Sequence, residues 1–410
     1  MLKVSVLIPT YNRADYLSQA LASVFAQSQG PFEIIVVDDG STDNTPEVIA
    51  AAEPRVRYIR HERNKGVAAA RNTGLKAACG DVVAWLDADD LWEPDFLKTV
   101  MPILERNGQV DGVYTGLRRI DAEGNLLPQS SQVEVPPAEL RTALVEDCFI
   151  QTSTFVARRR CFEQAGPFDP QFDICEDYDM FLRLAQFCTI VALPLPLVRY
   201  RVHPHNTVAN VAAFCRFRLA LTQKHFGEPQ GDPEGWPAEK RRAHGHAFRA
   251  AAFKCIEAGQ IDEGWQYLRR AFSIQPSLLD SLDTYYEVAC GDQPMGYRGQ
   301  ADLLDIEKNG AEIMARLDTL FAAGEPNLRT MRSAAYGNAY LALGILSDQA
   351  GRWQLARGYM LQAIRANPRL LASYPVVRRL LKLLAGRKLV RAGRRVLRNV
   401  HDQSLKGGLS

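Results

Sequence analysis

Asp-Val-Val-Ala-Trp-Leu-Asp-Ala-Asp-Asp-Leu-Trp, residues 81–92, is the stretch on which the fold prediction depends. Its apolar part, Val82 to Leu86, is short and uninterrupted, which is typical of a parallel strand buried on both faces. The run stops at three carboxylates, Asp87, Asp89 and Asp90. Because ligands of open α/β sheets bind just outside the carboxyl ends of the strands, the sequence places a candidate site here.

Two of these carboxylates can be read in two ways. Asp87 and Asp89 are two residues apart, so in extended chain they point the same way with their Cα atoms roughly 7 Å apart. They would repel each other unless a cation sat between or beside them, and oxygen ligands favour Mg²⁺ or Mn²⁺. The alternative is a solvated acidic turn that caps a helix beginning at Pro94. The sequence Asp87-Ala88-Asp89 alone leaves both interpretations open.

Composition limits the protein class. At 410 residues the chain can hold two domains and a tail. A net charge of +2 implies no global attraction to nucleic acid. The eight cysteines are scattered without a Cys-x-x-Cys pair, which argues against a disulfide framework and structural zinc, and for a reducing compartment.

Two further features bear on localisation. A strand-like run follows Met1-Leu2-Lys3 at once, so we expect no signal peptide. No apolar stretch reaches the ~20 residues that span a bilayer. The sequence therefore predicts a cytoplasmic protein.

The first part of the chain alternates strands with helices. Asn12 and Thr45 are expected to cap the helices that follow them. This alternation predicts an α/β unit with a mostly parallel, Rossmann-like sheet and right-handed crossovers. The expected strands are 3–8, 33–37, 56–59 and 81–86, and the expected helices are 14–25, one from 45, and 66–78.

Polar residues follow the strands of this unit: Thr10 to Arg13, Asp38-Asp39, and Asp87 to Asp90. They can converge, because the carboxyl ends of parallel strands lie on one edge. A nucleotide would supply N–H and O–H donors to such carboxylates, and its diphosphate would bring a metal. Neither Gly-x-Gly-x-x-Gly nor Gly-x-x-x-x-Gly-Lys-Ser/Thr is present, which disfavours a dinucleotide dehydrogenase and a P-loop NTPase.

Six motifs in order resemble the family 2 glycosyltransferases, which are inverting enzymes with the GT-A fold. The resemblance covers residues 1 to about 210, and the order of the motifs makes it specific. The motifs are Val4-Ser5-Val6-Leu7-Ile8-Pro9-Thr10-Tyr11-Asn12, Val36-Val37-Asp38-Asp39-Gly40-Ser41-Thr42-Asp43, Asn64-Lys65-Gly66 with Ala70-Arg71-Asn72-Thr73-Gly74, Leu86-Asp87-Ala88-Asp89-Asp90, Gly166-Pro167-Phe168-Asp169 with Glu176-Asp177-Tyr178-Asp179 and Arg183, and Tyr200-Arg201-Val202-His203.

The resemblance implies a nucleotide-sugar donor, most often a UDP-sugar. Asp39 would accept a hydrogen bond from the uracil N3–H, with Asp38 supporting it or reaching the ribose. Either aspartate could instead only cap the next helix, and Arg71 could be a surface helix cation. The nucleotide-binding residues implied in this way are Pro9, Thr10, Tyr11, Arg13, Asp38, Asp39, Lys65, Arg71, Asp87 and Ala88.

The same resemblance implies a divalent cation, Mg²⁺ or Mn²⁺, at an Asp-x-Asp motif. Asp89 would be the direct ligand and Asp87 would lie nearer the ribose or the metal-bound waters. His203 is a further candidate ligand, and His205 is close enough to compete for that role. A lone histidine is otherwise most often a structural donor. The cation would stabilise the charge of the leaving diphosphate.

An inverting displacement also needs a base on the face opposite the leaving group. Asp177 occupies the family position, with Glu176 and Asp179 as second choices. The base would deprotonate an acceptor hydroxyl, as the base of an inverting hydrolase deprotonates water. The alternative is a helix N-terminal cap, which suits carboxylates and is compatible with catalysis.

The stretch 118–160 is the least informative part of this half. Residues 121–125 predict a hairpin turn. Residues 129–137 are polar and contain proline, and we expect them to form a mobile loop near the acceptor.

After about Leu219, helical periodicity replaces the strand pattern. Residues 227–237, rich in Gly and Pro, read as a linker. The segments 247–279 and 339–371 match at an offset of 92 residues, each as helix, Gly turn, helix and Pro stop. They resemble tetratricopeptide repeats in part. A helical-hairpin domain of this kind could bind a protein partner, the acceptor or a second copy, or could only stabilise the catalytic half.

The tail from Val376 to Val400 carries nine Lys and Arg residues and no acid, interleaved with Leu and Val. A basic amphipathic helix of this kind can lie on an anionic membrane surface. It could equally pack on the repeats with a solvated basic face. Peripheral contact with the inner face of the membrane is therefore one hypothesis.

The sequence as a whole predicts a GT-A domain at 1–225, an α-helical domain at 226–375 and a basic tail at 376–410. The predicted function is metal-dependent, inverting transfer of a sugar from a nucleotide donor to a hydroxyl of a glycan, polysaccharide or lipid-linked acceptor. One rival is a sugar-nucleotide pyrophosphorylase, but Pro9 to Asn12 is no Gly-rich phosphate loop. The other is a catalytically inert protein that acts through its helical domain as a scaffold.

Overall fold

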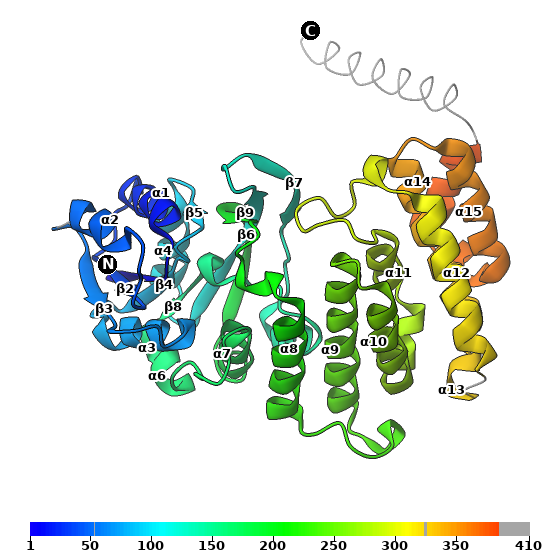
Figure 1. Ribbon diagram of the computed structural model, residues 1–410, viewed down its shortest axis with the longest axis horizontal. Helices are drawn as coiled ribbons and strands as arrows, with labels where there is room; N and C mark the ends of the chain where they lie inside the picture. The colour runs from blue at the N-terminus through cyan, green and yellow to red at the C-terminus, as the bar shows by residue number, and fades with distance from the viewer. Residues whose placement is uncertain (53, 324–325, 385–410) are drawn as a thin grey trace, which may run out of the picture. The chain divides into compact units, whose positions relative to one another are not determined.

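The computed structural model describes residues 1–52, 54–323 and 326–384 (Figure 1). The chain forms two compact units. The first comprises Met1–Ala258 and Pro294–Tyr297, and the second comprises Gly259–Gln293 together with the chain from Arg298 onward. The domain boundaries predicted at residues 225 and 375 stay a prediction, because compactness does not test which segments fold on their own.

A mixed sheet forms the centre of the first unit. In the described residues its order is β3-β2-β1-β4-β8-β6-β9-β5, and β7 pairs with β6 outside this path. The four amino-terminal strands are parallel, which confirms the predicted α/β fold, whereas β8 runs antiparallel to both β4 and β6. The strands are β1 Val4–Thr10, β2 Glu33–Asp38, β3 Arg57–Arg60, β4 Val82–Trp85, β5 Leu91–Trp92, β6 Gly112–Ile120, β7 Leu126–Ser131, β8 Phe155–Arg158 and β9 Ile190–Arg201.

Helices cover both faces of this sheet, so its central strands are apolar on both sides. Along β1, Val6 and Ile8 pack in one core cluster and Leu7 packs in the other. Helices α1, α2 and α4 contribute to the first cluster, and α3, α5, α6 and α7 contribute to the second. The helices of this unit are α1 Ala14–Phe25, α2 Thr45–Ala52, α3 Val67–Ala77, α4 Phe96–Arg106, α5 Leu140–Glu146, α6 Arg159–Ala165, α7 Glu176–Leu184, α8 Val211–Phe226 and α9 Ala238–Glu257.

The predicted cap at Asn12 is wrong. Asn12 has a φ of 51°, and its Oδ1 accepts a hydrogen bond from the Thr42 N–H at 2.8 Å, while the residue at the start of α1 is Arg13. Asn12 therefore ties the end of β1 to the loop after β2. Asparagine tolerates this left-handed conformation better than other non-glycine residues, which is why a polar residue before a helix is not always its cap.

The polar stretch predicted as a loop begins inside a strand instead. Residues 129–131 belong to β7, which pairs antiparallel with β6 beyond the predicted hairpin turn at 121–125. The edge of β7 that does not pair with β6 contacts residues 294–297. The Gln129 N–H donates a hydrogen bond to the Gly296 carbonyl at 3.2 Å. An edge strand can be polar on both faces, so composition does not distinguish it from a loop.

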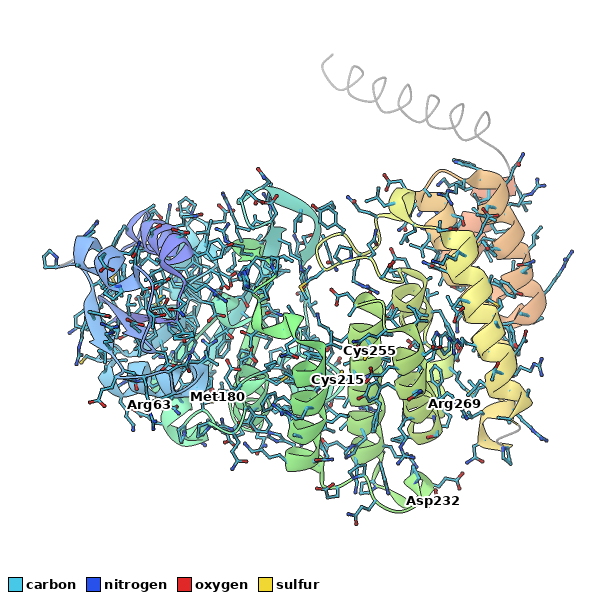
Figure 2. All side chains as sticks on the ribbon, in the orientation of Figure 1. Arg63, Met180, Cys215, Asp232, Cys255 and Arg269 are labelled. Carbon is cyan, nitrogen blue, oxygen red and sulfur yellow. The ribbon has the colours of Figure 1, made fainter. Side chains whose placement is uncertain are left out.

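Helices α8 and α9 form a hairpin at the end of the first unit. Cys215 on α8 and Cys255 on α9 lie with their sulfur atoms 3.9 Å apart in the buried seam between them (Figure 2). The stretch 227–237 predicted as a linker joins these two helices and contains Asp232 at its exposed turn (Figure 2). Its glycines and prolines therefore turn the chain within the first unit.

The second unit is helical, as predicted. Gly259 and Gly351, the glycines of the two matching segments, have φ values of +76° and +70°, which explains why both turns use glycine. Gly344 on α14 lets Met360 of α15 approach, since a Cβ there would lie 3.0 Å from its sulfur. The helices are α10 Ile261–Ile274, α11 Leu282–Ala289, α12 Ile306–Ala322, α13 Pro326–Arg329, α14 Arg332–Gln349 and α15 Trp353–Ala366, and the Pro stops begin the 3₁₀ turns Pro276–Asp280 and Pro368–Ala372.

The start of the basic tail packs on this unit. Val376, Leu380 and Leu383 are buried in a cluster with residues of α14 and α15. Lys382 and Arg379 both form ion pairs with Asp348, at 3.2 and 3.6 Å. The rest of the predicted amphipathic tail, 385–410, lies outside the described residues. Among the helices formed by the described residues, none has the length and apolar character needed to cross a bilayer.

Two glycines with similar backbone conformations allow a test of the loop packing around the site. Gly40 and Gly166 have φ values of +78° and +79°, but a Cβ on Gly40 would lie 2.7 Å from the backbone of Arg63, whereas Gly166 has open space (Figure 2 labels Arg63). We expect Gly166→Ala to cost about 1–2 kcal/mol through backbone strain alone. Gly40→Ala should cost clearly more, because the loop at Arg63 must also move. Thermal and urea unfolding of both variants measures the difference, and equal losses would contradict the close approach.

Candidate active site

A pocket of about 660 Å³ lies beyond the carboxyl ends of β1, β2 and β4. The polar residues after these strands converge here, and the segment 173–177 before and at the start of α7 forms another wall. Asp38 and His203 lie outside the lining. The predicted site residues that line the pocket are Pro9, Thr10, Tyr11, Arg13, Asp39, Lys65, Arg71, Asp87, Ala88, Asp89, Glu176 and Asp177.

Asp38 stabilises the turn after β2. It is fully buried, and its Oδ1 accepts a hydrogen bond from the Ser41 N–H at 2.8 Å. Its Oδ2 accepts a hydrogen bond from the Tyr58 hydroxyl at 2.8 Å and pairs with Arg60 at 3.5 Å. Burial, together with the Asp38 carboxylate, raises the pKa of Tyr58, so this hydroxyl stays a donor. Asp38 therefore stabilises the turn that carries Asp39.

Asp39 organises the loop that precedes α3. Its carboxylate accepts hydrogen bonds from the backbone N–H groups of Lys65 and Gly66 at 3.0 and 2.8 Å, and its Oδ1 lies 2.6 Å from His61 Nδ1. The carboxylate is 3% exposed. Most of its acceptor capacity is thus used within the protein, and a nucleotide base would have to share it.

The segment after β1 offers polar groups of three kinds. Thr10 is buried, and its Oγ1 has no hydrogen-bond partner within the described part of the chain. Tyr11 is 40% exposed and can stack on a planar ligand. Arg13 donates from Nη2 to the His205 carbonyl at 2.7 Å, which ties this segment to the loop after β9.

Arg71 on α3 is a buried cation between the carboxyl groups of Asp87 and Glu176. Its Nη2 donates to Asp87 Oδ1 at 2.9 Å and its Nε donates to Glu176 Oε1 at 3.2 Å. The side chain is 3% exposed, and in the described residues its Nη1 has no hydrogen-bond partner. Trp85 and Phe168 pack against the guanidinium. Arg71 is therefore no surface helix cation, and its Nη1 is a buried N–H group that no described protein group satisfies.

The carboxylates after β4 belong to a tight turn with distinct roles. The Asp90 N–H donates to the Asp87 carbonyl at 3.1 Å, which closes the turn. Asp90 is 1% exposed, and burial and the charges of Asp89 and Asp87 raise its pKa well above the usual range. Asp87 and Asp89 face the pocket, with side chains 29% and 20% exposed. Asp90 is thus the structural member of the three.

His203, a predicted metal ligand, contacts the carboxylate of Asp89. Its Nε2 lies 2.9 Å from Asp89 Oδ2, and its Nδ1 accepts a hydrogen bond from the His205 N–H at 3.2 Å. An Nδ1 that accepts a hydrogen bond carries no proton, so the proton of a neutral ring sits on Nε2 and is donated to Asp89. His205 contributes its backbone to this arrangement.

The donor set around Asp89 fits a divalent cation with few protein ligands. Among the described residues, no three His, Cys, Asp or Glu side chains converge as a metal site. Asp89 offers carboxylate oxygens, whereas His203 could bind through Nε2 only if its proton moved to Nδ1. Asp87 Oδ1 is engaged by Arg71. A cation here would take its remaining ligands from water and from a bound diphosphate, as Mg²⁺ commonly does.

Glu176 and Asp177 differ in their environments at the start of α7. Burial raises the pKa of Glu176 to about 8, with a further contribution from the charge of Asp177. Glu176 is therefore largely protonated at neutral pH. Asp177 lies at the pocket wall, and its Oδ2 accepts a hydrogen bond from the Thr152 hydroxyl at 3.1 Å. The protonated form of Glu176 cannot accept a proton, so Glu176 is unsuited to act as a base at neutral pH.

Asp179, the other second choice for the base, lies outside the pocket lining. Its carboxylate is fully buried and contacts Arg183, Lys224 and His225 at 2.6–2.8 Å. Although burial favours the neutral form, hydrogen bonds from His225 and Lys224 and the charge of Arg183 lower the pKa of Asp179. This cluster joins α7 to α8.

Several site residues escaped the sequence analysis. Thr152, Ser153 and His61 hold predicted carboxylates in place, and Asn206 and Thr207 add to the pocket lining. Their hydroxyl and imidazole groups stand in no recognisable motif. The sequence around 152–154 gave no functional signal, because the partners of Thr152 and Ser153 lie 25 to 66 residues away in the chain.

Comparisons with known proteins identify the family. The family model "Glycosyl transferase family 2" matches residues 5–165. An uncharacterized glycosyltransferase of Nostoc sp. strain PCC 7120 is 36% identical over 232 residues, which is 54% of this chain and 71% of the relative. The chain belongs to glycosyltransferase family 2. This confirms the resemblance inferred from the six motifs and identifies the protein as an enzyme of the glycosyltransferase class.

Other relatives and solved structures match part of the chain. Chondroitin synthase of Escherichia coli is 33% identical over 187 residues, covering 45% of this glycosyltransferase but only 26% of the synthase. The crystal structure of S. aureus TarS 1-349 superposes with a TM-score of 0.50 at 20% identity, over 76% of this chain and 92% of that one. At this level of identity, the likeness shows the fold alone.

The Asp179 cluster predicts a pH-dependent loss of stability. Asp179→Asn should lower the unfolding midpoint at neutral pH, because it leaves the cations around it without a buried counter-charge. A carboxyl with a lowered pKa stabilises the fold above its unfolded value of 3.8, and that contribution is lost as pH falls further. The gap between wild type and variant should therefore narrow below about pH 4 in thermal unfolding. A gap that stays constant with pH would contradict the ionic role.

Proposed function

We propose that this glycosyltransferase moves a sugar from a nucleotide-sugar donor, a UDP-sugar, to a hydroxyl group of a glycan, polysaccharide or lipid-linked acceptor, with inversion at the anomeric carbon. The observation that carries the proposal is one pocket that brings together the turn at Asp87 and Asp89, the loop organised by Asp39, and the half-buried carboxylate of Asp177. Family membership supports sugar transfer, and the relative named chondroitin synthase supports a glycan acceptor.

The donor would occupy the part of the pocket formed by the ends of β1, β2 and β4. Tyr11 offers a surface for the base, and Thr10 Oγ1 offers an unused buried polar group. Arg71 Nη1 would contact the diphosphate, since an unpartnered buried guanidinium N–H is stabilised by an anion. The diphosphate would therefore accept a hydrogen bond from a guanidinium N–H that the described protein groups leave without an acceptor.

Asp177 would act as the base for the acceptor. Its carboxylate takes the proton of the acceptor hydroxyl as the hydroxyl oxygen bonds to the anomeric carbon. The bond from that carbon to the diphosphate breaks, and its electron pair leaves with the nucleoside diphosphate. Glu176 is unsuited to this step near neutral pH, because its raised pKa of about 8 keeps it protonated.

Asp89 is the residue best placed to hold a divalent cation, Mg²⁺ or Mn²⁺, with His203 as a second ligand after transfer of its ring proton. A bound cation supplies charge stabilisation for the departing diphosphate, so no general acid is needed there. Arg71 would share this task through Nη1, while its Nη2 hydrogen bond orients Asp87.

A nucleotide panel tests donor class and metal dependence together. UDP at 100 times its Kd should stabilise the protein by about 2.7 kcal/mol, a readily visible shift of the unfolding midpoint. We expect that shift only with Mn²⁺ or Mg²⁺ present, and we expect Asp89→Ala to abolish it. A shift with GDP but not with UDP would show that the donor carries guanine and not uracil. The absence of a shift with every nucleotide at every metal concentration would refute the proposed donor site.

Substitutions at the two adjacent carboxylates test which is the base. Asp177→Asn should lower the rate of sugar transfer by about 10²–10⁴ while leaving the Kd for nucleotide unchanged. Glu176→Gln should change the rate far less at pH 7, because glutamine resembles the protonated carboxyl that already predominates. Initial rates with each donor and calorimetric nucleotide titrations make the comparison. The reverse ranking of the two variants would move the base to Glu176.

Stability gives an independent check on the Glu176 assignment. A carboxyl whose pKa is raised from 4.5 to about 8 stabilises the fold fully below the lower value, and this contribution is lost as pH rises through the higher one. Glu176→Gln removes that dependence. The variant should therefore gain stability relative to wild type between about pH 5 and pH 8 in thermal unfolding. A flat difference would indicate that Glu176 ionises normally.

Partner binding by the helical unit and membrane binding by the tail are two further proposals. The helical unit is a candidate surface for a protein partner or a second copy of the chain. Part of the apolar face of residues 376–384 is already buried against α14 and α15. Membrane contact would therefore depend on residues 385–410. Sedimentation with anionic liposomes, comparing the full chain with a 1–384 truncation, decides whether these residues bind lipid.

A further inference from the structure

A single 3₁₀ turn, Thr152–Thr154, touches both chemical ends of the pocket. It places three hydroxyl side chains in succession, with exposures of 4%, 0% and 1%. Each hydroxyl has a different partner. Since the turn is buried between β4, β6 and β9, it has little freedom to move.

The middle hydroxyl fixes the turn that carries the Asp-x-Asp motif. Ser153 Oγ accepts a hydrogen bond from the Asp87 N–H at 3.0 Å and donates to Asp90 Oδ2 at 2.6 Å. The Ser153 carbonyl accepts a further bond from Trp92 Nε1 at 2.9 Å. Ser153 thus binds the first and last residues of the 87–90 turn at once and sets the direction in which its two pocket-facing carboxylates point.

The preceding hydroxyl reaches the other end of the pocket. Thr152 Oγ1 donates to Asp177 Oδ2 at 3.1 Å. The other oxygen of Asp177 accepts the Tyr178 backbone N–H at 2.7 Å. Within the described residues, Thr152 is the side chain that hydrogen-bonds Asp177. A β-branched threonine is stiff at χ1, so this contact restricts the rotamer of Asp177.

The third hydroxyl serves as a built-in comparison. Thr154 Oγ1 donates to the Gln151 carbonyl at 2.7 Å and contacts neither carboxylate. Its burial matches that of its neighbours, so its loss should perturb the turn to a similar extent. Effects of Thr152 or Ser153 that exceed those of Thr154 therefore report on their particular partners.

We infer that Thr152 and Ser153 are positioning residues, and that the turn 152–154 sets the spacing between the donor-binding turn at Asp87 to Asp90 and the carboxylate of Asp177. The inference rests on the proposed function, which assigns these two groups to the donor and to the acceptor. In-line displacement requires the attacking and leaving oxygens on opposite sides of one carbon. A misplacement of about 1 Å in such a geometry can cost on the order of 100-fold in rate.

Three matched variants separate the two arms. Thr152→Val should lower kcat by about 10- to 100-fold with the Kd for UDP and Mn²⁺ unchanged, as expected for one lost hydrogen bond to a charged group in the reacting geometry. Ser153→Ala should instead weaken binding of UDP with Mn²⁺ by about fivefold or more, because the 87–90 turn loses its anchor. Thr154→Val should change neither quantity by more than about twofold. Thr152→Ser, which keeps the hydroxyl, should restore most of kcat.

The inference is overturned if Thr152→Val and Thr154→Val have the same kcat, or if Thr152→Ser fails to rescue. It is equally overturned if Ser153→Ala binds UDP and Mn²⁺ like Thr154→Val.

A second measurement is independent of turnover. In a double-mutant cycle on thermal stability, Thr152→Val and Asp177→Ala should be coupled, whereas Thr154→Val and Asp177→Ala should be additive. If wild type transfers no sugar from any donor, the proposed function fails, and the cycle still decides whether Thr152 holds Asp177. Additivity of both pairs would overturn the link.

Discussion

A buried guanidinium holds the two carboxylate-bearing elements of the site together. Arg71 lies between Asp87, which follows β4, and Glu176, which begins α7, and it hydrogen-bonds both. Removing one partner of such a buried charge cluster is costly, because the remaining charges lose both water and counter-charge. Its remaining Nη1 donor faces no protein acceptor among the described residues. The described protein groups thus leave one guanidinium N–H of this cluster without an acceptor.

A second buried arginine, Arg201, holds the turn after β4 in place. Arg201 is fully buried, its N–H donates to Asp90 Oδ1 at 2.9 Å, and its Nε donates to the Asp89 carbonyl at 2.8 Å. Ser153 holds the opposite side of this turn. The 87–90 segment is therefore fixed from β9 and from the turn 152–154, so the carboxylates of Asp87 and Asp89 that face the pocket are already oriented before a ligand binds. Preorganised charges of this kind need little rearrangement during the reaction.

Much of this could be predicted from local sequence. The strands that end at Thr10, Asp38 and Trp85 are apolar runs followed by polar residues, and a parallel sheet must bring those ends to one edge. Contacts between distant segments could not be predicted. Ser153 reaches Asp87 across 66 residues, and a single hydroxyl carries no periodicity that would reveal this. The wrong helix cap at Asn12 has the same origin, because its true partner, Thr42, lies 30 residues away.

The segment before α7 shows how such distant contacts support local strain. Cys175 has a φ of 71°, a left-handed conformation that costs a non-glycine residue on the order of 1–3 kcal/mol. Strain of this kind persists only where the surroundings over-determine the backbone. Here Glu176 is held by Arg71 and Asp177 is held by Thr152, so the two residues after Cys175 are fixed from separate elements. Both carboxyls line the pocket, but Glu176 is buried against Arg71 whereas Asp177 is only half-buried and accepts a hydrogen bond from Thr152, so two adjacent residues have different environments.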